Sequence, residues 1–238
     1  MKYVILNHKM NLEYKTMKTY AETLKKLDLK SNKLIVCPSD IYLTNFIDLG
    51  FQVGSQNASS NKDGAYTGEV SASQLRSLGV KYSLVGHSER RKYFKETNQE
   101  INKKIRLLLL NRIRPILCVG ESLNEKNSRC TKEVIFRQLQ GAFDKLSKEN
   151  IGQLIIAYEP VWAIGSGKVP SNEEIERVVL YIKEIVYKSF KVKVDVVYGG
   201  SVNNENIELL KSAKGVDGYL LGGISLKLDK LQELINRL

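Results

Sequence analysis

The sequence predicts an α/β fold, a single (β/α)8 barrel that extends over residues 1–238. Short apolar β-type runs alternate with helix-period segments along the whole chain, and eight strand candidates leave about 30 residues for each strand-plus-helix unit. The strand cores lack clean polar alternation, as expected where helices cover a parallel sheet. An open, doubly wound sheet is the structural alternative, but no G-x-G-x-x-G motif follows the first strand to favour it.

The alternation can be followed element by element, and no low-complexity linker interrupts it. The strand candidates are Tyr3–Asn7, Lys33–Cys37, Gln52–Gln56, Tyr82–Gly86, Pro115–Val119, Leu154–Glu159, Lys193–Tyr198 and Gly218–Leu221. The helix candidates are Thr16–Leu27, Thr97–Asn111, Thr131–Leu146, Ser171–Tyr187, Asn203–Lys211 and Ser225–Arg237. One of these helices opens with Ser171 and Glu174 in capping-box spacing.

Composition and charge favour an ordinary folded enzyme of the cytoplasm. The chain is 42% hydrophobic, no apolar run is long enough to span a membrane, and the N-terminus enters a strand-like run without room for a signal peptide. Its three cysteines form no close pair, which is typical of reduced thiols and argues against a disulfide frame or a zinc site. The net charge of +11 would steer anionic partners, either a phosphorylated metabolite or nucleic acid. Because no basic run is interleaved with aromatics, we expect no nucleic-acid partner.

The stretch after the sixth strand candidate has the composition of a lid. Glu159 ends an apolar run, Pro160 stops the strand, and two glycines follow a rigid apolar segment that contains the only Trp. A carboxylate beneath such a lid suggests proton chemistry shielded from water. The alternative is an ordinary loop that carries a surface Glu. The lid residues are Pro160, Val161, Trp162, Ala163, Ile164, Gly165, Ser166, Gly167 and Lys168.

In a (β/α)8 barrel, functional residues lie where the strands end. Alternation along the first strand sends Asn7 and Lys9 to one side, where they could offer an amide and an ammonium, or Lys9 could be a solvated surface lysine. His87 follows the fourth strand and precedes a short helix that begins at Ser88, whose positive end would keep the ring neutral. The alternative for His87 is a core histidine that the backbone satisfies. Cys118, in the fifth strand, is more readily explained as a small buried side chain than as a nucleophile.

Two glycine turns predict a phosphate site. Gly199-Gly200-Ser201 follows the seventh strand, and Gly222-Gly223 follows the eighth. Backbone N–H groups of such turns can converge on a phosphate, and barrels hold phosphate at these two strand ends. Glu121, after the fifth strand, could accept a hydrogen bond from the indole N–H of Trp162 in one state of the lid.

With these motifs assembled, the chain resembles the triosephosphate isomerase family. The matching motifs are N-H-K-M-N, V-G-H-S-E-R-R, C-V-G-E, A-Y-E-P-V-W-A-I-G-S-G-K, Y-G-G-S-V and L-G-G-I-S, in the family's order from residue 7 to residue 225. The resemblance implies isomerisation of a triose phosphate with no metal or organic cofactor. It implies a base at Glu159, an electrophile at His87, and enediolate stabilisation by Lys9 with Asn7 beside it. It places phosphate on the backbone of Gly165, Ser201, Gly222 and Gly223, with Glu89 in support.

The resemblance also implies a homodimer, in which the third loop reaches the partner's site. Gln56-Asn57 and residues 64–69 match that loop, with Thr67 at its tip; a plain surface hairpin is the alternative. Three positions depart from the family pattern: His8 replaces Trp, Ser166 replaces Thr, and Ile224 replaces Ala. The first two should affect packing or lid rates, and Ile224 bears on the geometry of the phosphate turn.

Two other functions remain open at this point. Another phosphate-binding barrel enzyme with a carboxylate and a lysine would not explain His87 together with the Pro-Val-Trp lid. A non-catalytic polyanion-binding protein would use the net charge, and its binding would be salt-sensitive and would survive Glu159→Gln.

Overall fold

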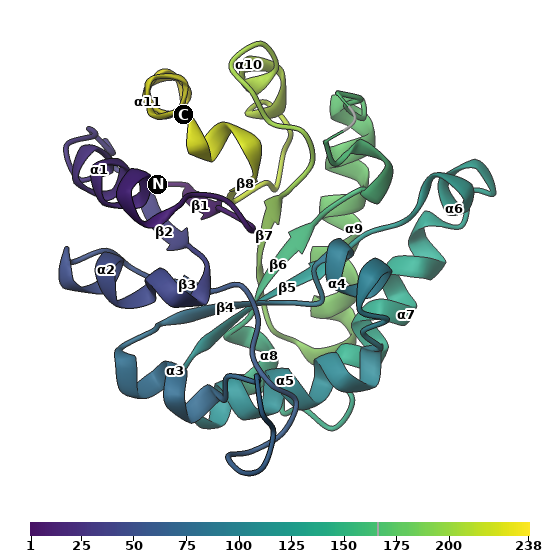
Figure 1. Ribbon diagram of the computed structural model, residues 1–238. Helices are drawn as coiled ribbons and strands as arrows, with labels where there is room; N and C mark the ends of the chain where they lie inside the picture. The colour runs from purple at the N-terminus through teal and green to yellow at the C-terminus, as the bar shows by residue number, and fades with distance from the viewer. Residues whose placement is uncertain (166) are drawn as a thin grey trace.

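The computed structural model describes residues 1–165 and 167–238, and its strands form one barrel. Eight parallel strands pair in the order β2-β1-β8-β7-β6-β5-β4-β3, and a bridge between Val36 and Val53 joins the two ends of that order (Figure 1). The helices lie around the outside of this sheet. The predicted (β/α)8 class is therefore confirmed. The strands are β1 Tyr3–Asn7, β2 Lys33–Cys37, β3 Gly54–Ser55, β4 Tyr82–Val85, β5 Arg114–Val119, β6 Ile155–Tyr158, β7 Asp195–Tyr198 and β8 Gly218–Leu221.

The strands lack polar alternation because both of their faces are buried. Ile5 is paired with Ile35 on one side and Leu220 on the other, and these three side chains belong to the apolar filling of the barrel. The neighbouring Val4 and Leu6 point the other way and belong to the larger core between strands and helices. Each strand except β3 thus contributes to two apolar layers.

The α-helices are α1 Tyr14–Leu24, α2 Leu43–Asp48, α3 Ala72–Leu78, α4 Ser88–Tyr93, α5 Asn98–Leu110, α6 Leu123–Asn127, α7 Thr131–Phe143, α8 Lys148–Gly152, α9 Asn172–Phe190, α10 Ile207–Leu210 and α11 Leu228–Arg237. The six predicted helices are all found, as is the short helix that begins at Ser88. The predicted capping box is confirmed, because the Ser171 hydroxyl accepts from the N–H of Glu174 and the Glu174 side chain accepts from the N–H of Ser171. Among the described residues, no helix is both long and apolar enough to cross a membrane.

Two departures from the predicted bounds have local causes. The strand expected over Gln52–Gln56 shortens to β3, because Val53 forms only the isolated bridge to Val36. The helix expected from Asn203 begins only at Ile207, since the Asn203 side chain accepts from the N–H groups of Glu205 and Asn206 and so stabilises a turn instead.

Candidate active site

The predicted site residues from the strand ends meet in one cavity of about 240 Å³ at the carboxyl end of the barrel. Asn7 closes β1, Glu159 follows β6 directly, and His87 lies two residues after β4. The lid and the two glycine turns complete the wall. The lining residues named by the sequence are Asn7, Lys9, His87, Glu159, Ile164, Gly165, Gly199, Gly200, Ser201, Gly222 and Gly223.

Glu159 and His87 form the closest ionisable pair in this cavity. His87 Nε2 lies 3.3 Å from Glu159 Oε1, and both side chains are almost fully buried. Glu159 Oε2 has no hydrogen-bond partner among the described residues. A Cβ on Gly199 would lie 2.8 Å from Cγ of Glu159. Only glycine at this position therefore leaves room for the Glu159 side chain beside the end of β7. A buried carboxylate oxygen without a partner is well suited to accept a proton.

Two opposing influences act on the protonation of His87. Nδ1 accepts the N–H of Glu89 at 3.3 Å, which leaves Nε2 to carry the proton of a neutral ring. Burial has the largest effect on the pKa of His87 and lowers it, but the charge and hydrogen bond of Glu159, with the charge of Glu89, outweigh burial and raise this pKa. The hydrogen bond to Nδ1 therefore fits the predicted neutral ring, whereas the two carboxylates favour the charged ring.

Lys9, which lines the same cavity, has an unusual backbone conformation. Its φ is +51°, a left-handed conformation that is uncommon for a residue with a side chain. Three side chains stabilise it: Asn7 Oδ1 accepts the Lys9 N–H at 3.0 Å, while Ser39 and Gln56 donate to the Lys9 carbonyl. The Lys9 ammonium pairs with Glu89 at 2.7 Å. Ser39 is a supporting residue that no motif in the sequence signals.

The two turns after β7 and β8 face this group of side chains across the cavity. The Ser201 hydroxyl donates to the lid carbonyl of Ala163 at 2.5 Å, and the Ser225 hydroxyl donates to the Gly222 carbonyl at 2.6 Å. Ile224 is partly buried and packs against the outer core, so its larger side chain is accommodated outside the cavity.

His8 belongs to the structural support of the site. It packs between Tyr20 and Phe46, and its Nε2 lies 3.1 Å from the Tyr20 hydroxyl, which donates to the Ser225 carbonyl at 2.6 Å. Since the Tyr20 hydrogen is used by Ser225, His8 Nε2 is the donor to Tyr20. These contacts connect the end of β1 to the turn after β8, a link that the sequence did not reveal.

The lid is held at its first residues by a buried carboxylate. The Trp162 indole donates to Glu121 Oε1 at 2.7 Å, as predicted for one state of the lid, and the Tyr158 hydroxyl donates to the same carboxylate at 3.3 Å. Residues Val161–Ala163 form a short 3-10 turn, and Gly165 and Gly167 have positive φ. Ser166, a predicted lid residue, lies outside the described residues.

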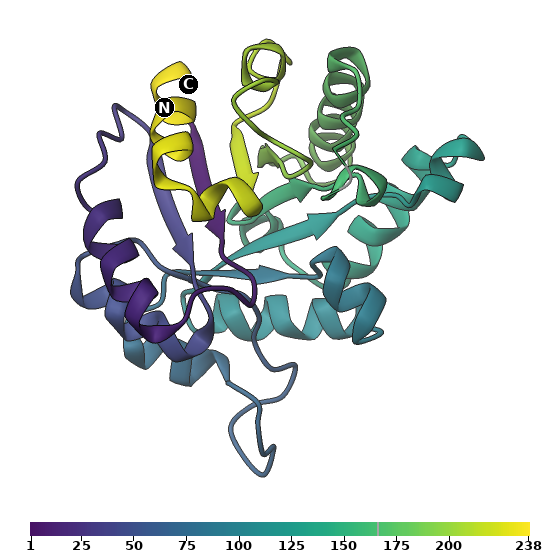
Figure 2. The same cartoon turned by 45° about the horizontal axis from the view of Figure 1, so that its top comes forward.

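Three other residues named from the sequence lie outside the cavity. Cys118 is fully buried, and burial raises the pKa of its thiol well above the usual value, in keeping with a packing role. Thr67 is exposed on the loop that projects from the barrel (Figure 2). Glu89 contacts Lys9 at the edge of the cavity rather than lining it.

Comparison with known proteins agrees with this geometry. The family model of triosephosphate isomerase matches residues 2–238. Among curated proteins, the chain is 41% identical over 194 residues to triosephosphate isomerase of Alkaliphilus oremlandii, covering 80% of this chain and 78% of the relative. It is 38% identical over 243 residues to triosephosphate isomerase of Clostridium botulinum strain ATCC 19397, covering 97% and 96%. The chain belongs to the triosephosphate isomerase family.

Proposed function

We propose that this chain interconverts dihydroxyacetone phosphate and D-glyceraldehyde 3-phosphate through an enediolate, the triose phosphate step of glycolysis and gluconeogenesis. The observation that carries the proposal is the single cavity in which a buried carboxylate, an imidazole and an ammonium face two glycine turns. The chemistry requires a base, a donor to the developing oxyanion and exclusion of water, and these residues supply all three without a cofactor.

Glu159 is the base in this proposal. Its unpartnered Oε2 can take a proton from one substrate carbon and return it to the neighbouring carbon. The same carboxylate thus serves both directions of the reaction. Gly199 leaves the space that it needs beside β7.

His87 is the electrophile. Nε2 donates to the substrate carbonyl and shuttles protons between the two oxygens, while the N–H of Glu89 occupies Nδ1. When Glu159 has taken the substrate proton it is neutral, so the charge that raises the pKa of His87 is gone, and burial then favours the neutral ring. A glutamate base paired with a neutral histidine is the known arrangement of the triosephosphate isomerase family, so this pairing is not unique to the chain.

Lys9 stabilises the enediolate with its positive charge, and Asn7 fixes the backbone that carries it. The phosphate lies on the backbone of Gly165, Ser201, Gly222 and Gly223. In this arrangement the lid segment from Pro160 to Lys168 closes over the substrate, because phosphate contacts remote from the reacting carbons can stabilise the closed lid.

We also propose that the chain is one catalytic domain that works as a homodimer in the cytoplasm, with Thr67 at the subunit contact. The exposed loop around Thr67 and the reduced, unpaired cysteines support this arrangement. No nucleic-acid or membrane partner enters the proposal.

The test is conversion of glyceraldehyde 3-phosphate, followed by a coupled assay for dihydroxyacetone phosphate. Glu159→Gln keeps the size of the side chain but removes the base, so kcat should fall by roughly 10²–10⁴-fold with little change in unfolding temperature. Glu149→Gln, at a fully exposed carboxylate, is the matched control and should keep the parent rate. Near-normal turnover in Glu159→Gln would contradict the mechanism.

A further inference from the structure

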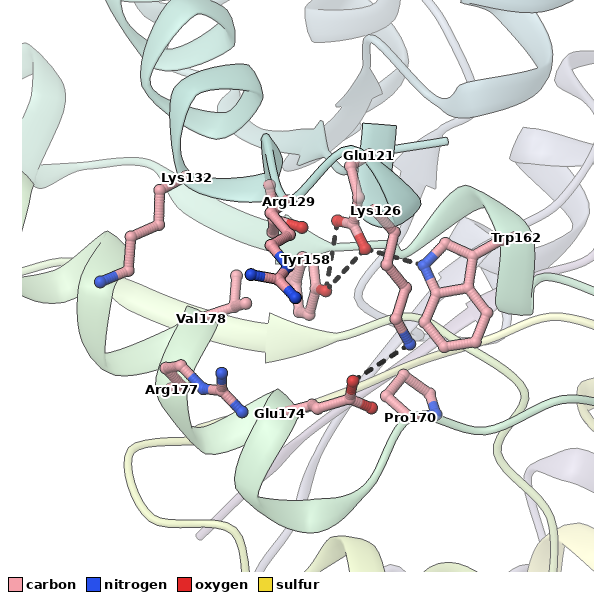
Figure 3. Close-up of a pocket in the computed structure, with 11 residues that line it drawn as sticks. Glu121, Lys126, Arg129, Lys132, Tyr158, Trp162, Pro170, Glu174, Arg177 and Val178 are labelled. Atoms are coloured by element: carbon pink, nitrogen blue, oxygen red, sulfur yellow. Dashed lines mark hydrogen bonds and ion pairs between the residues drawn. The ribbon is translucent and has the colours of Figure 1, made fainter. Parts of the chain in front are cut away.

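A second cavity lies behind the lid, outside the candidate active site. It has a volume of about 390 Å³, against about 240 Å³ for the active-site cavity. Its walls come from the loop after β5, from α6 and the start of α7, from the first turns of α9, and from the lid (Figure 3). Neither Glu159 nor His87 lines it. The proposed isomerase mechanism therefore does not explain this cavity.

Positive charge exceeds negative charge around this cavity. Among the described residues its lining includes four basic side chains and two carboxylates. Both carboxylates are already engaged: Glu121 accepts from Trp162 and Tyr158, and Glu174 pairs with Lys126 at 3.1 Å. The guanidinium groups of Arg129 and Arg177 form no hydrogen bond and no close ion pair with any residue that the structure describes, and the charge of Arg177 acts only at longer range, where it helps to lower the pKa of Glu173 and Glu174. The cavity thus has two planar cations available for a ligand.

The cavity adjoins one residue within the lid and one residue just after it. Trp162, from the start of the lid, and Pro170, just beyond its last residue, are both lining residues. Lys126 lies over the Trp162 ring, with Nζ 3.6 Å from the ring centroid, and also forms the ion pair with Glu174 on α9 (Figure 3). A ligand in this position would therefore contact the moving segment and the fixed helices together.

We propose that this cavity, the lid-flank site, binds a small phosphate-bearing anion through Arg129 and Arg177, and that the bound anion biases the position of the lid. Guanidinium groups match phosphate oxygens in bidentate geometry, and two of them favour a dianion over a monocarboxylate. Pro170 and Val178 add an apolar surface for a short carbon chain. Because the ligand would contact Trp162 in the lid and Pro170 two residues after it, its affinity differs between lid positions, and that difference shifts the lid equilibrium.

The chain carries a built-in reporter for this site. Trp162 is the only tryptophan and lines the cavity, so its fluorescence should change when an anion binds there. Inorganic pyrophosphate is a suitable probe, but it would also bind at the glycine turns of the active site. Gly223→Asp removes that competition, since a Cβ at Gly223 meets no atom within 4 Å and the carboxylate repels phosphate there.

We expect a saturable change in Trp162 fluorescence when pyrophosphate is added to the Gly223→Asp protein. Adding Arg129→Gln and Arg177→Gln should weaken this binding by about tenfold or more, because two charge-assisted contacts are lost. The double variant Arg106→Gln/Arg112→Gln is the matched control. Both arginines are exposed and lie outside the cavity, and their replacement lowers the net charge of the protein by the same two units. Absence of a saturable change, or equal weakening in both arginine pairs, would overturn the site.

The effect on the lid is tested by turnover, and this half of the inference depends on the proposed isomerase function. At saturating triose phosphate, competition at the active site disappears, so pyrophosphate should still lower kcat of the parent chain but not of Arg129→Gln/Arg177→Gln. An unchanged kcat in the parent would overturn the coupling to the lid. The fluorescence titration needs no catalysis, so failure of the isomerase proposal would leave the binding result intact.

Discussion

His8 and His87 are both buried, but their surroundings shift their pKa values in opposite directions. Burial lowers the pKa of His8 to about 4, and no carboxylate offsets it. At His87 burial also acts most strongly and lowers the pKa, but Glu159 and Glu89 together outweigh it and raise the value. His87 therefore contributes stability that is present below about pH 6.5 and is lost as the pH rises through its raised folded pKa. At His8 the sign is reversed, so stability is lost as the pH falls below about 6.5 toward its lowered folded pKa.

His8 should make the protein less stable in acid. Between about pH 6.5 and pH 4, His8 binds a proton in the unfolded chain but stays neutral in the folded chain. The free energy of unfolding therefore falls by up to about 3 kcal/mol over this range. His8→Phe removes the titrating group but keeps an aromatic ring between Tyr20 and Phe46. Its loss of stability on acidification should be smaller by that amount.

The measurement is urea unfolding of parent and His8→Phe protein at several pH values from 7 to 4. Carboxylates and His87 titrate in both proteins, so the difference between the two curves isolates His8. Parallel curves would show that the pKa of His8 is the same in the folded and the unfolded chain, which would contradict the prediction.

At the scale of elements, the sequence predicts best where a single local signal decides the outcome. The bounds of β1, β2 and β8 agree with the prediction because each is an apolar run that ends at a change of residue type. The sequence does not indicate α2, α3, α6 and α8, which are each seven residues or shorter and lack a long apolar period. For short helices, packing against the barrel outweighs local propensity.

In the candidate site, too, local motifs predict some features, and contacts between distant elements decide the others. Residue types and their positions at strand ends could be read from motifs, because a parallel barrel brings all strand ends together. The raised pKa of His87 could not be predicted, since it depends on the distance to Glu159 across the barrel. The contacts of Lys126 with Trp162 and Glu174 could not be predicted either, because they join three separate elements by side-chain geometry alone.

The lid itself gives an element-scale prediction about Glu121. This carboxylate is 1% exposed and accepts its shortest hydrogen bond from Trp162. Trp162→Phe removes that donor and should lower the free energy of unfolding by about 1–3 kcal/mol, because a buried carboxyl group loses a hydrogen-bond partner. The rate at which the lid opens and closes should change as well, because the same hydrogen bond holds the start of the lid. A changed lid rate would be measured as a changed kcat.

A double-mutant cycle separates this bond from the loss of the indole ring. Thermal unfolding of the parent, Trp162→Phe, Glu121→Gln and the double variant gives a coupling free energy for the pair. Additive effects of the two substitutions would mean that the bond does not stabilise the lid.

At the scale of the whole molecule, one face next to the candidate site is incompletely covered. A cavity of about 640 Å³ opens beside Lys9 and Glu89, and large apolar side chains on its rim are strongly exposed: Met10 by 95%, Tyr93 by 65% and Phe94 by 66%. Exposed apolar groups around a cavity are typical of a protein–protein contact. The projecting loop that carries Thr67 is of the kind that could fill such a cavity on a second copy (Figure 2).

The homodimer proposal therefore predicts a defect for Thr67→Arg. A long charged side chain at the tip of the loop should prevent docking into the apolar-rimmed cavity, so the protein should sediment as one 27.0 kDa chain rather than two. Turnover per chain should fall by about tenfold or more, because Lys9 lies in the wall of the cavity that the loop would fill, and small displacements there alter reactive geometry. Sedimentation velocity and the isomerase assay at matched concentrations measure both effects.

Thr19→Arg, the same change on the exposed face of α1, should leave mass and rate at the parent values. A Thr67→Arg protein with the mass of the parent would show that this loop does not form the subunit contact, and a monomer with parental turnover would show that the site is complete within one chain.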